Sequence, residues 1–325
     1  MCSRILWNDN KLAVVVARTM DWPQSTEPIL TVFPRGMKRD GGRLKSKVIV
    51  NENPATWVSK YASLITAGYG MGAADGFNEK GVAIHLLYLR ATDLGPRVPA
   101  KPGVHIAMWG QYVLDNAATV AEALSLLDTI NVVMLMLPNG MGATLHMAIE
   151  DATGDSAIVE FIKGKLVVHH GRQYQIMTND PTYDEQLALL KKQNFSKPSM
   201  DLPIPGNVNA ADRFQRAAYY KAVLQEPKSE QQAVAGVLAI ARNVSVPFDA
   251  PYHDFGVYNT EYRTVANLTT RRYFFELTDQ PNVIWADLPT FNLAEGAPVM
   301  VLDPHDIELS GNVSARFEKA TSAPF

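Results

Sequence analysis

The chain has 325 residues, of which 47% are hydrophobic and 19% are charged, a balance typical of folded globular proteins and not of disordered ones. Its 30 basic and 33 acidic side chains give a net charge of −3 without any lysine- or arginine-rich cluster, so neither a nucleic-acid partner nor a basic tail is expected. No apolar run reaches the ~18 residues that a membrane span needs, and polar residues interrupt the N-terminus where a signal peptide would be apolar. We therefore expect no membrane partner and a cytoplasmic location, or a periplasmic one if a leader has been removed.

The first part of the chain predicts strands. Residues 2–7 and 12–20 are apolar runs separated by the turn-forming residues 8–10, which is typical of a β-hairpin. The second run is rich in β-branched residues, as in a strand buried on both faces, and Pro23 ends it. Two further strands are expected at residues 57–69 and 81–89, with turns at Asp75-Gly76 and at residues 78–81.

The rest of the chain predicts blocks of helices and strands. The predicted elements, in order, are helices at residues 105–116 and 119–127, a four-stranded antiparallel meander at 144–179, helices at 210–224 and 229–242, and strands from 257 to 285. Because the blocks do not alternate regularly, antiparallel sheets with segregated helices are expected, in as many as four layers. The lack of repeats, linkers or low-complexity tracts predicts a single domain over residues 1–325.

The single cysteine of the chain, Cys2, directly follows Met1. A lone cysteine is usually a small buried hydrophobe, and a Met-Cys start also arises by chance. Removal of Met1, however, would leave Cys2 with both a thiol nucleophile and a free α-amino group. The reference pKa of that amine, about 7.7–8.0, suits a general base. Cys2 is therefore a candidate N-terminal nucleophile.

Two charged residues, Arg18 and Asp21, lie at the end of the predicted buried strand. An unpaired charge is costly to bury, so each of them needs a partner. A salt bridge at the end of the strand is one interpretation, and a functional site is the other. Their spacing places them on opposite faces of a regular strand, so both reach one site only if the chain bends near Met20.

Several segments together resemble the choloylglycine hydrolase family, which includes conjugated bile acid hydrolases and penicillin V acylases. The similar segments are Met1-Cys2-Ser3-Arg4, Ala17-Arg18-Thr19-Met20-Asp21-Trp22, Phe33-Pro34-Arg35-Gly36-Met37, Asn78-Glu79-Lys80-Gly81, Leu145-His146-Met147-Ala148-Ile149, Met177-Thr178-Asn179, Asp212-Arg213-Phe214-Gln215-Arg216 and Arg242-Asn243-Val244-Ser245-Val246-Pro247. The resemblance implies an α+β fold, the four-layer αββα sandwich of antiparallel sheets of N-terminal nucleophile hydrolases. It also implies hydrolysis of a non-peptide amide without a cofactor, and a homo-oligomer (a tetramer or a dimer). The short stretch at residues 181–212 resembles the Gram-negative branch of the family.

The resemblance also implies roles for particular residues. Cys2 matches the nucleophile, Arg18 the arginine beside it, and Asp21 the aspartate that orients the α-amine. Asn179 matches the asparagine of the oxyanion hole, and Arg213 the second arginine of the site. Tyr88 aligns with the remaining oxyanion donor, a position that is often asparagine in bile acid hydrolases and tyrosine in penicillin V acylases.

The acyl pocket is harder to place from the sequence. Its candidate lining residues are Met20, Trp22, Leu87, Tyr88 and Met141. Core packing explains any one of them more often than a ligand does, and Trp22 is the best candidate because it adjoins Asp21. An apolar pocket separates a steroid acid poorly from a phenoxyacetyl group, so conjugated bile acids and penicillin V are both expected substrates. An N-acyl homoserine lactone acylase and an inactive, ligand-binding family member are the alternatives.

Two other patterns are not expected to bind ligands. Residues 68–73 have the spacing of a dinucleotide-binding fingerprint, but a predicted turn follows them where a helix is required. The seven histidines and the single cysteine lack the spacing of a zinc site, so no metal is expected.

Overall fold

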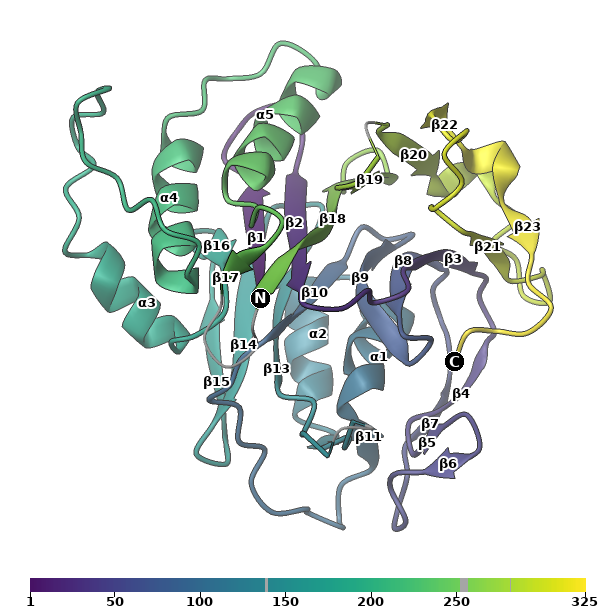
Figure 1. Cartoon of the computed structure of the whole chain (residues 1–325). Coiled ribbons are helices and arrows are strands. Elements are labelled where there is room, and N and C mark those ends of the chain that lie inside the picture. The colour runs from purple at the N-terminus through teal and green to yellow at the C-terminus, as the bar shows by residue number, and fades with distance from the viewer. Residues whose placement is uncertain (138–139, 252–256, 281) are drawn as a thin grey trace.

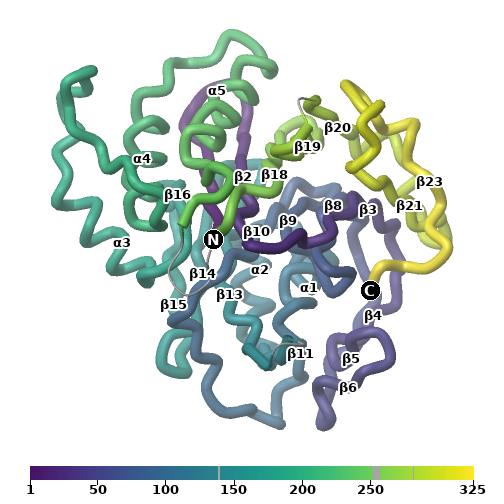
Figure 2. Tube along the Cα trace, in the orientation of Figure 1, coloured from purple at the N-terminus to yellow at the C-terminus, as the bar shows by residue number. Residues whose placement is uncertain are grey.

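Two large β-sheets are stacked face to face between two groups of helices, as Figures 1 and 2 show. The structure, a computed structural model, describes residues 1–137, 140–251, 257–280 and 282–325. In these residues, sheet 1 contains, in spatial order, β16 (Ile176–Met177), β1 (Cys2–Trp7), β2 (Val15–Trp22), β18 (Val257–Asn267), β19 (Arg272–Leu277), β20 (Ile284–Asp287) and β22 (Gly311–Asn312), with β17 (Ala250–Pro251) paired to β18. Sheet 2 contains β15 (Lys165–His170), β14 (Ser156–Ile162), β13 (Leu145–Glu150), β10 (Ala83–Tyr88), β9 (Gly72–Asn78), β8 (Ser63–Gly68), β3 (Ile29–Phe33), β21 (Met300–Leu302) and β23 (Glu318–Lys319).

The helices form the two outer layers. Helices α4 (Ala210–Ala222) and α5 (Glu230–Asn243) cover sheet 1, and α3 (Tyr183–Leu190) packs against α4. Helices α1 (Trp109–Asn116) and α2 (Val120–Leu127) cover sheet 2. One apolar core fills the space between the sheets and under α4 and α5, and a second lies between sheet 2 and α1 and α2. The predicted α+β fold with four αββα layers is confirmed, and within the described residues of the two large sheets the pairing is antiparallel except where β22 joins β20 in parallel.

The β1–β2 hairpin forms as predicted, in an unbroken register from Cys2 opposite Met20 to Trp7 opposite Val15. The side-chain carbonyl of Asn10 accepts hydrogen bonds from the backbone N–H groups of residues 12 and 13, at 2.9 and 2.8 Å. This local bonding satisfies turn amides that would otherwise be unpaired. The hairpin places the first residues of the chain in the middle of the molecule.

The two strands predicted around residues 57–89 are corrected by the structure. The first one divides into β7 (Thr56–Val58), which pairs with the short β4 (Lys38–Asp40), and β8. The turn predicted at Asp75-Gly76 is wrong, because both residues lie inside β9. The chain instead reverses at Tyr69 and Gly70, whose φ angles are +54° and +55°. Glycine is the residue that adopts such angles most readily.

The predicted four-stranded meander is wrong in its last strand. Strands β13, β14 and β15 pair in sequence within sheet 2, but β16 crosses to sheet 1 and pairs with β1, with Arg4 opposite Met177. The strand with which β16 pairs depends on side-chain packing against a segment distant in sequence, and the local pattern of apolar and polar residues does not reveal it. The crossing brings Asn179, two residues after β16, next to the N-terminus.

The predicted helices differ from the structure mainly at their ends. The helix expected at residues 105–116 begins only at Trp109, after β11 (Gly103–His105), which pairs with β12 (Asn131–Val133), and a single 3₁₀ turn. Helices α2 and α5 begin as predicted, and their caps Thr119 and Ser229 accept the N–H groups of Glu122 and Gln232. Strand β3 and helix α3 were not predicted. None of the helices in the described part of the chain has the length and apolarity that crossing a bilayer requires.

Candidate active site

Cys2 is the first residue of β1, and its thiol points into the space between the sheets. It lies across from Met20, whose Sδ is 3.8 Å from Cys2 Sγ. Arg18 lies on the same face of β2 as Met20, with Nη2 at 3.6 Å from the sulfur. A cation at this distance favours the thiolate, which is the nucleophilic form of cysteine.

Arg18 is buried and fixed in place by neighbours from both sheets. Its Nη1 donates to the hydroxyl of Tyr262 at 3.1 Å, and its Nη2 donates to the carbonyl of Leu86 at 3.2 Å. Burial by itself lowers the pKa of Arg18, but Tyr262, Cys2 and Asp75 outweigh burial and hold that pKa above its ordinary value. Arg18 therefore stays a cation beside the thiol at every physiological pH.

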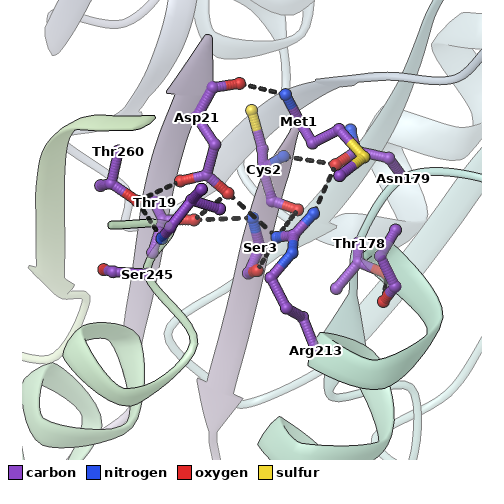
Figure 3. Close-up of polar contacts among 12 residues, drawn as sticks. Met1, Cys2, Ser3, Thr19, Asp21, Thr178, Asn179, Arg213, Ser245 and Thr260 are labelled. Carbon is purple, nitrogen blue, oxygen red and sulfur yellow. Dashed lines mark hydrogen bonds and ion pairs between the residues drawn. The ribbon is translucent and has the colours of Figure 1, made fainter. Parts of the chain in front are cut away.

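Asp21 and Arg213 form a buried ion pair on the opposite face of β2 (Figure 3). Arg213 Nη1 lies 3.0 Å from Asp21 Oδ2, and neither side chain is exposed to solvent. The hydroxyls of Thr260 and Thr19 donate to the same carboxylate at 2.6 and 3.2 Å. The bend predicted near Met20 is absent, because β2 is continuous and Arg18 and Asp21 keep opposite faces. Both still border the N-terminus, since the hairpin brings it between them.

Asn179 connects the two faces of the site. Its Oδ1 accepts the backbone N–H of Cys2 and also Arg213 Nη2, the latter at 3.1 Å. Its Nδ2 donates to the carbonyl of Tyr88 at 2.6 Å. Gln186 of α3 donates to the Asn179 carbonyl at 3.2 Å and so restrains the backbone. The Asn179 amide is therefore held next to Cys2 with its orientation fixed (Figure 3).

Met1 occupies a buried position next to the site. Its α-amine donates to the carbonyl of Asp21, and its own carbonyl accepts the Asp21 N–H at 2.7 Å. Its side chain packs against Val246 and Tyr258. Burial lowers the pKa of the Met1 amine from 8.0 to about 6. With Met1 attached, the nitrogen of Cys2 is an amide, which cannot act as a base.

A cavity of about 460 Å³ opens beside Cys2, and apolar side chains make most of its wall. The rings of Trp22 and Tyr88 pack against each other in its wall, with their centroids 5.8 Å apart and an angle of 53° between their planes. Met20 and Met141, two of the candidates for an acyl pocket, also line the cavity, and Leu87 is not among its lining residues. Because β10 alternates its side chains, Leu86 and Tyr88 line the cavity and Leu87 is buried in the core between the sheets.

The sequence analysis did not identify part of this wall. The β8–β9 turn contributes Tyr69 and Gly72, and Arg90 lies at the cavity after β10. A Cβ atom on Gly72 would be 1.8 Å from the carbonyl oxygen of Ala107, so only glycine fits there. The glycine-rich string 68–73, taken above as lacking a ligand role, is thus a tight turn in the cavity wall. Within the described residues, His, Cys, Asp and Glu side chains form no group of three that could hold a metal ion.

Comparison with known proteins agrees with this geometry. Residues 2–307 match the family described as linear amide C–N hydrolases, choloylglycine hydrolase family. The chain belongs to the choloylglycine hydrolase family. It is 36% identical to a penicillin V acylase of Pectobacterium atrosepticum, over the whole of this chain and 92% of that protein. A bile salt hydrolase/transferase of Bifidobacterium longum is 23% identical over 87% of this chain and 94% of its own.

Solved structures of choloylglycine hydrolases show the same fold. A penicillin V acylase from Agrobacterium tumefaciens superposes with a TM-score of 0.88 at 38% identity, covering all of this chain and 98% of its own. A conjugated bile acid hydrolase from Clostridium perfringens, a C2A mutant, superposes with a TM-score of 0.79 at 20% identity, covering 96% and 98% of the two chains. The predicted family and its chemistry, hydrolysis of linear amides, are thereby confirmed.

The sequence analysis missed the hydroxyl residues that support the buried ion pair. Ser3, Thr19 and Asp21 share the outer face of the β1–β2 hairpin, and Ser3 Oγ accepts Arg213 Nη1 at 2.5 Å. Alternation along the two strands could have indicated this shared face, because residues two apart point the same way. Thr260 comes from β18, and no local signal connects it to Asp21.

Proposed function

We propose that this choloylglycine hydrolase cleaves linear amides with an aromatic acyl group, with the phenoxyacetyl amide of penicillin V as the leading substrate and Cys2 as the nucleophile. The observation that carries the proposal is the apolar cavity beside Cys2 Sγ, flanked by the rings of Trp22 and Tyr88. Two aromatic rings in the cavity wall favour a planar ring packed beside them. The similarity to two penicillin V acylases supports the same substrate.

The chemistry begins once Met1 has been removed. The Cys2 thiolate attacks the amide carbonyl, and the carbonyl oxygen takes up the negative charge. The side-chain amide nitrogen of Asn179 has two N–H groups. One of them donates to the Tyr88 carbonyl, so the other can donate to the negatively charged oxygen of the substrate. The leaving amine takes a proton from the Cys2 ammonium group and departs. Water then attacks the thioester, gives its proton to the Cys2 amine, and releases the acid and the thiolate.

The neighbours of the Cys2 nitrogen suit an α-amine that must gain and lose a proton. Asn179 Oδ1 already accepts the N–H of Cys2, and the Asp21 carbonyl, which now binds the Met1 amine, becomes free when Met1 leaves. Both are acceptors for an ammonium group. Arg213 is a second cation close by, and its charge favours the neutral, basic amine that the last step needs.

One charged residue in the cavity wall distinguishes between the candidate substrates. Arg90 lines the cavity, beyond Tyr88. Penicillin V and glycine-conjugated bile acids both release an amine that carries a carboxylate, which a guanidinium can pair. An acyl homoserine lactone releases an amine whose lactone ring carries no carboxylate. Arg90 therefore favours an amide with an acidic leaving group over an acyl homoserine lactone.

The test is amine release from penicillin V and glycocholate, measured side by side with the parent protein and its Cys2→Ala variant. We expect cleavage of penicillin V in clear preference, with no cleavage by the variant. The intact mass of the protein shows whether Met1 is absent. Cleavage that survives Cys2→Ala refutes the nucleophile, and preference for glycocholate refutes the aromatic acyl assignment. A Met1-free protein that binds penicillin V without cleaving it is an inactive, ligand-binding member.

A further inference from the structure

A set of charged side chains is buried between the two sheets, behind Cys2. On sheet 1, Arg4 lies directly across from Arg18, and like charges at opposed positions repel each other. Sheet 2 supplies the anions. Glu150 Oε2 lies 2.5 Å from Arg4 Nη2, and Asp75 lies within electrostatic reach of Arg18. Thr264, the cross-strand partner of Arg18, donates its hydroxyl to Asp75 Oδ2, so it connects the two sheets.

His85 of β10 joins the two anions. Its Nδ1 is 3.0 Å from Asp75 Oδ1, its Nε2 is 2.5 Å from Glu150 Oε1, and its side chain is 1% exposed. A neutral imidazole has one N–H and one lone pair, so it would direct the lone pair at a carboxylate. Only the imidazolium presents an N–H to both carboxylates, in a hydrogen bond with Glu150 and an ion pair with Asp75. Burial by itself lowers the pKa of His85, but Glu150 and Asp75 outweigh burial and raise that pKa to about 9.

The titratable groups that face this set also include two phenols and the α-amine of Met1, whose pKa burial lowers from 8.0 to about 6. Tyr262 of β18 accepts from Arg18, and Tyr273 of β19 shares a 2.7 Å hydrogen bond with Thr66. Burial raises the pKa of both tyrosines. The charges of this set are therefore three cations (Arg4, Arg18 and His85) and two anions (Asp75 and Glu150). Cys2 Sγ, 3.6 Å from Arg18, makes the set electrically neutral only as a thiolate.

We propose that His85 is a positioning residue that keeps Cys2 in its thiolate form. As an imidazolium, His85 bridges Asp75 and Glu150, and the positive charge of Arg18 is then balanced only by the thiolate of Cys2. An excess charge in a buried set is costly, and ionisation of Cys2 removes it. With an uncharged residue at position 85, Asp75 would compensate Arg18, and the set would already be neutral with the thiol. The inference rests on the proposed role of Cys2 as nucleophile.

The test is the pH profile of alkylation by iodoacetamide, which reacts with the thiolate and reports Cys2 alone, because the chain has one cysteine. Intact mass follows the reaction. We expect the midpoint of the His85→Gln profile to lie about one pH unit or more above that of the parent, so alkylation below both midpoints slows about tenfold. In the double variant His85→Gln/Asp75→Asn, one cation and one anion are lost together, and the midpoint should return close to the parent value.

His146→Gln is the matched control. His146 is a second buried histidine in sheet 2, and its Nδ1 lies 3.0 Å from Oε1 of a different carboxylate, Glu160. It should lower the urea midpoint of unfolding as His85→Gln does, while the alkylation midpoint stays in place. The proposal fails if His85→Gln leaves the alkylation midpoint unchanged, or if His146→Gln moves it equally.

A third variant covers the case in which His85→Gln does not fold. Asp75→Asn removes an anion beside Arg18 and should lower the alkylation midpoint, so a midpoint that does not fall overturns the proposal. Alkylation requires no amide substrate. The positioning role and the proposed amidase function can therefore fail separately: the first through an unshifted midpoint, the second through absence of Cys2-dependent cleavage.

Discussion

Replacing Arg213 with methionine should both destabilise the protein and stop turnover. The guanidinium donates to five acceptors, which are the carbonyls of Cys2 and Val208, Ser3 Oγ, Asp21 Oδ2 and Asn179 Oδ1. Methionine keeps part of the apolar stem but loses every one of these bonds. The Asp21 carboxylate then stays buried with only two hydroxyl donors, from Thr19 and Thr260.

The size of the effect follows from the burial of both partners. Removing one member of a buried ion pair costs about 3–5 kcal/mol, because the remaining charge is still withheld from water. Asp21 and Arg213 are both fully buried, so this range applies to the free energy of unfolding without a discount for solvent. Arg213→Lys keeps the charge but not the planar fork that binds Asp21 and Asn179 together. We expect it to recover about half of the stability, while turnover falls about 10²-fold as Asn179 loses its alignment.

Two measurements separate these roles. Urea unfolding followed by circular dichroism gives the stability, and initial rates on penicillin V give the turnover. Arg216→Met is the matched control, because Arg216 lies on the same helix and bonds only to neutral acceptors on residues 205, 207 and 243. It should leave turnover at the parent level. An Arg213→Met protein as stable as the parent, or an Arg213→Lys protein with full turnover, would refute the reasoning.

Three further predictions concern other parts of the molecule. The free energy of unfolding should fall as pH rises from about 6.5 to 9. The reason is that folded His85, with its raised pKa of about 9, keeps a proton that the unfolded chain releases near 6.5. Urea titrations across this range should show the fall in the parent protein and not in His85→Gln. Arg90→Gln should raise KM for penicillin V about tenfold and leave KM unchanged for a phenoxyacetyl amide with an uncharged amine, as steady-state kinetics on both can check. Gly72→Ala should lower the free energy of unfolding by more than about 2 kcal/mol, since its Cβ would be 1.8 Å from the Ala107 carbonyl oxygen; an unchanged urea midpoint would contradict this.

The elements that the sequence predicted well are those defined by local chemistry. The β1–β2 hairpin depends on the Asn10 side chain, and helices α2 and α5 depend on the caps Thr119 and Ser229, all within a few residues of the backbone groups that they bond. The turn predicted at Asp75-Gly76 failed for the opposite reason. Gly76 has a φ of +151°, which side chains rarely adopt, and it lies in β9, where a Cβ would be 2.5 Å from the Leu64 carbonyl oxygen. Close packing between neighbouring strands, and not a turn, explains this glycine.

The candidate site was predicted residue by residue from family resemblance, and local patterns would not have assembled it. Asn179 reaches Cys2 only because β16 leaves one sheet for the other, a choice made by pairing across more than 170 positions. Asp75, His85 and Glu150 are unremarkable in sequence, since a buried charge is recognisable only when its partners are known. The catalytic roles, the single domain and the oligomeric state remain predictions.

The division of the site between the two faces of one hairpin gives a physical reason for a nucleophile at the N-terminus. Strand alternation directs the Cys2 thiol inward, to Arg18, and directs Ser3 and Asp21 outward, to Arg213. A side chain can serve only one of these faces. The backbone nitrogen lies in the plane of the sheet, between them, and at the end of a strand it has no preceding residue to block it once Met1 is gone. The Cys2 amine can thus be held by the residues of the outer face, while the Cys2 thiolate is held by Arg18 on the inner face. Each charge is then stabilised without neutralising the other.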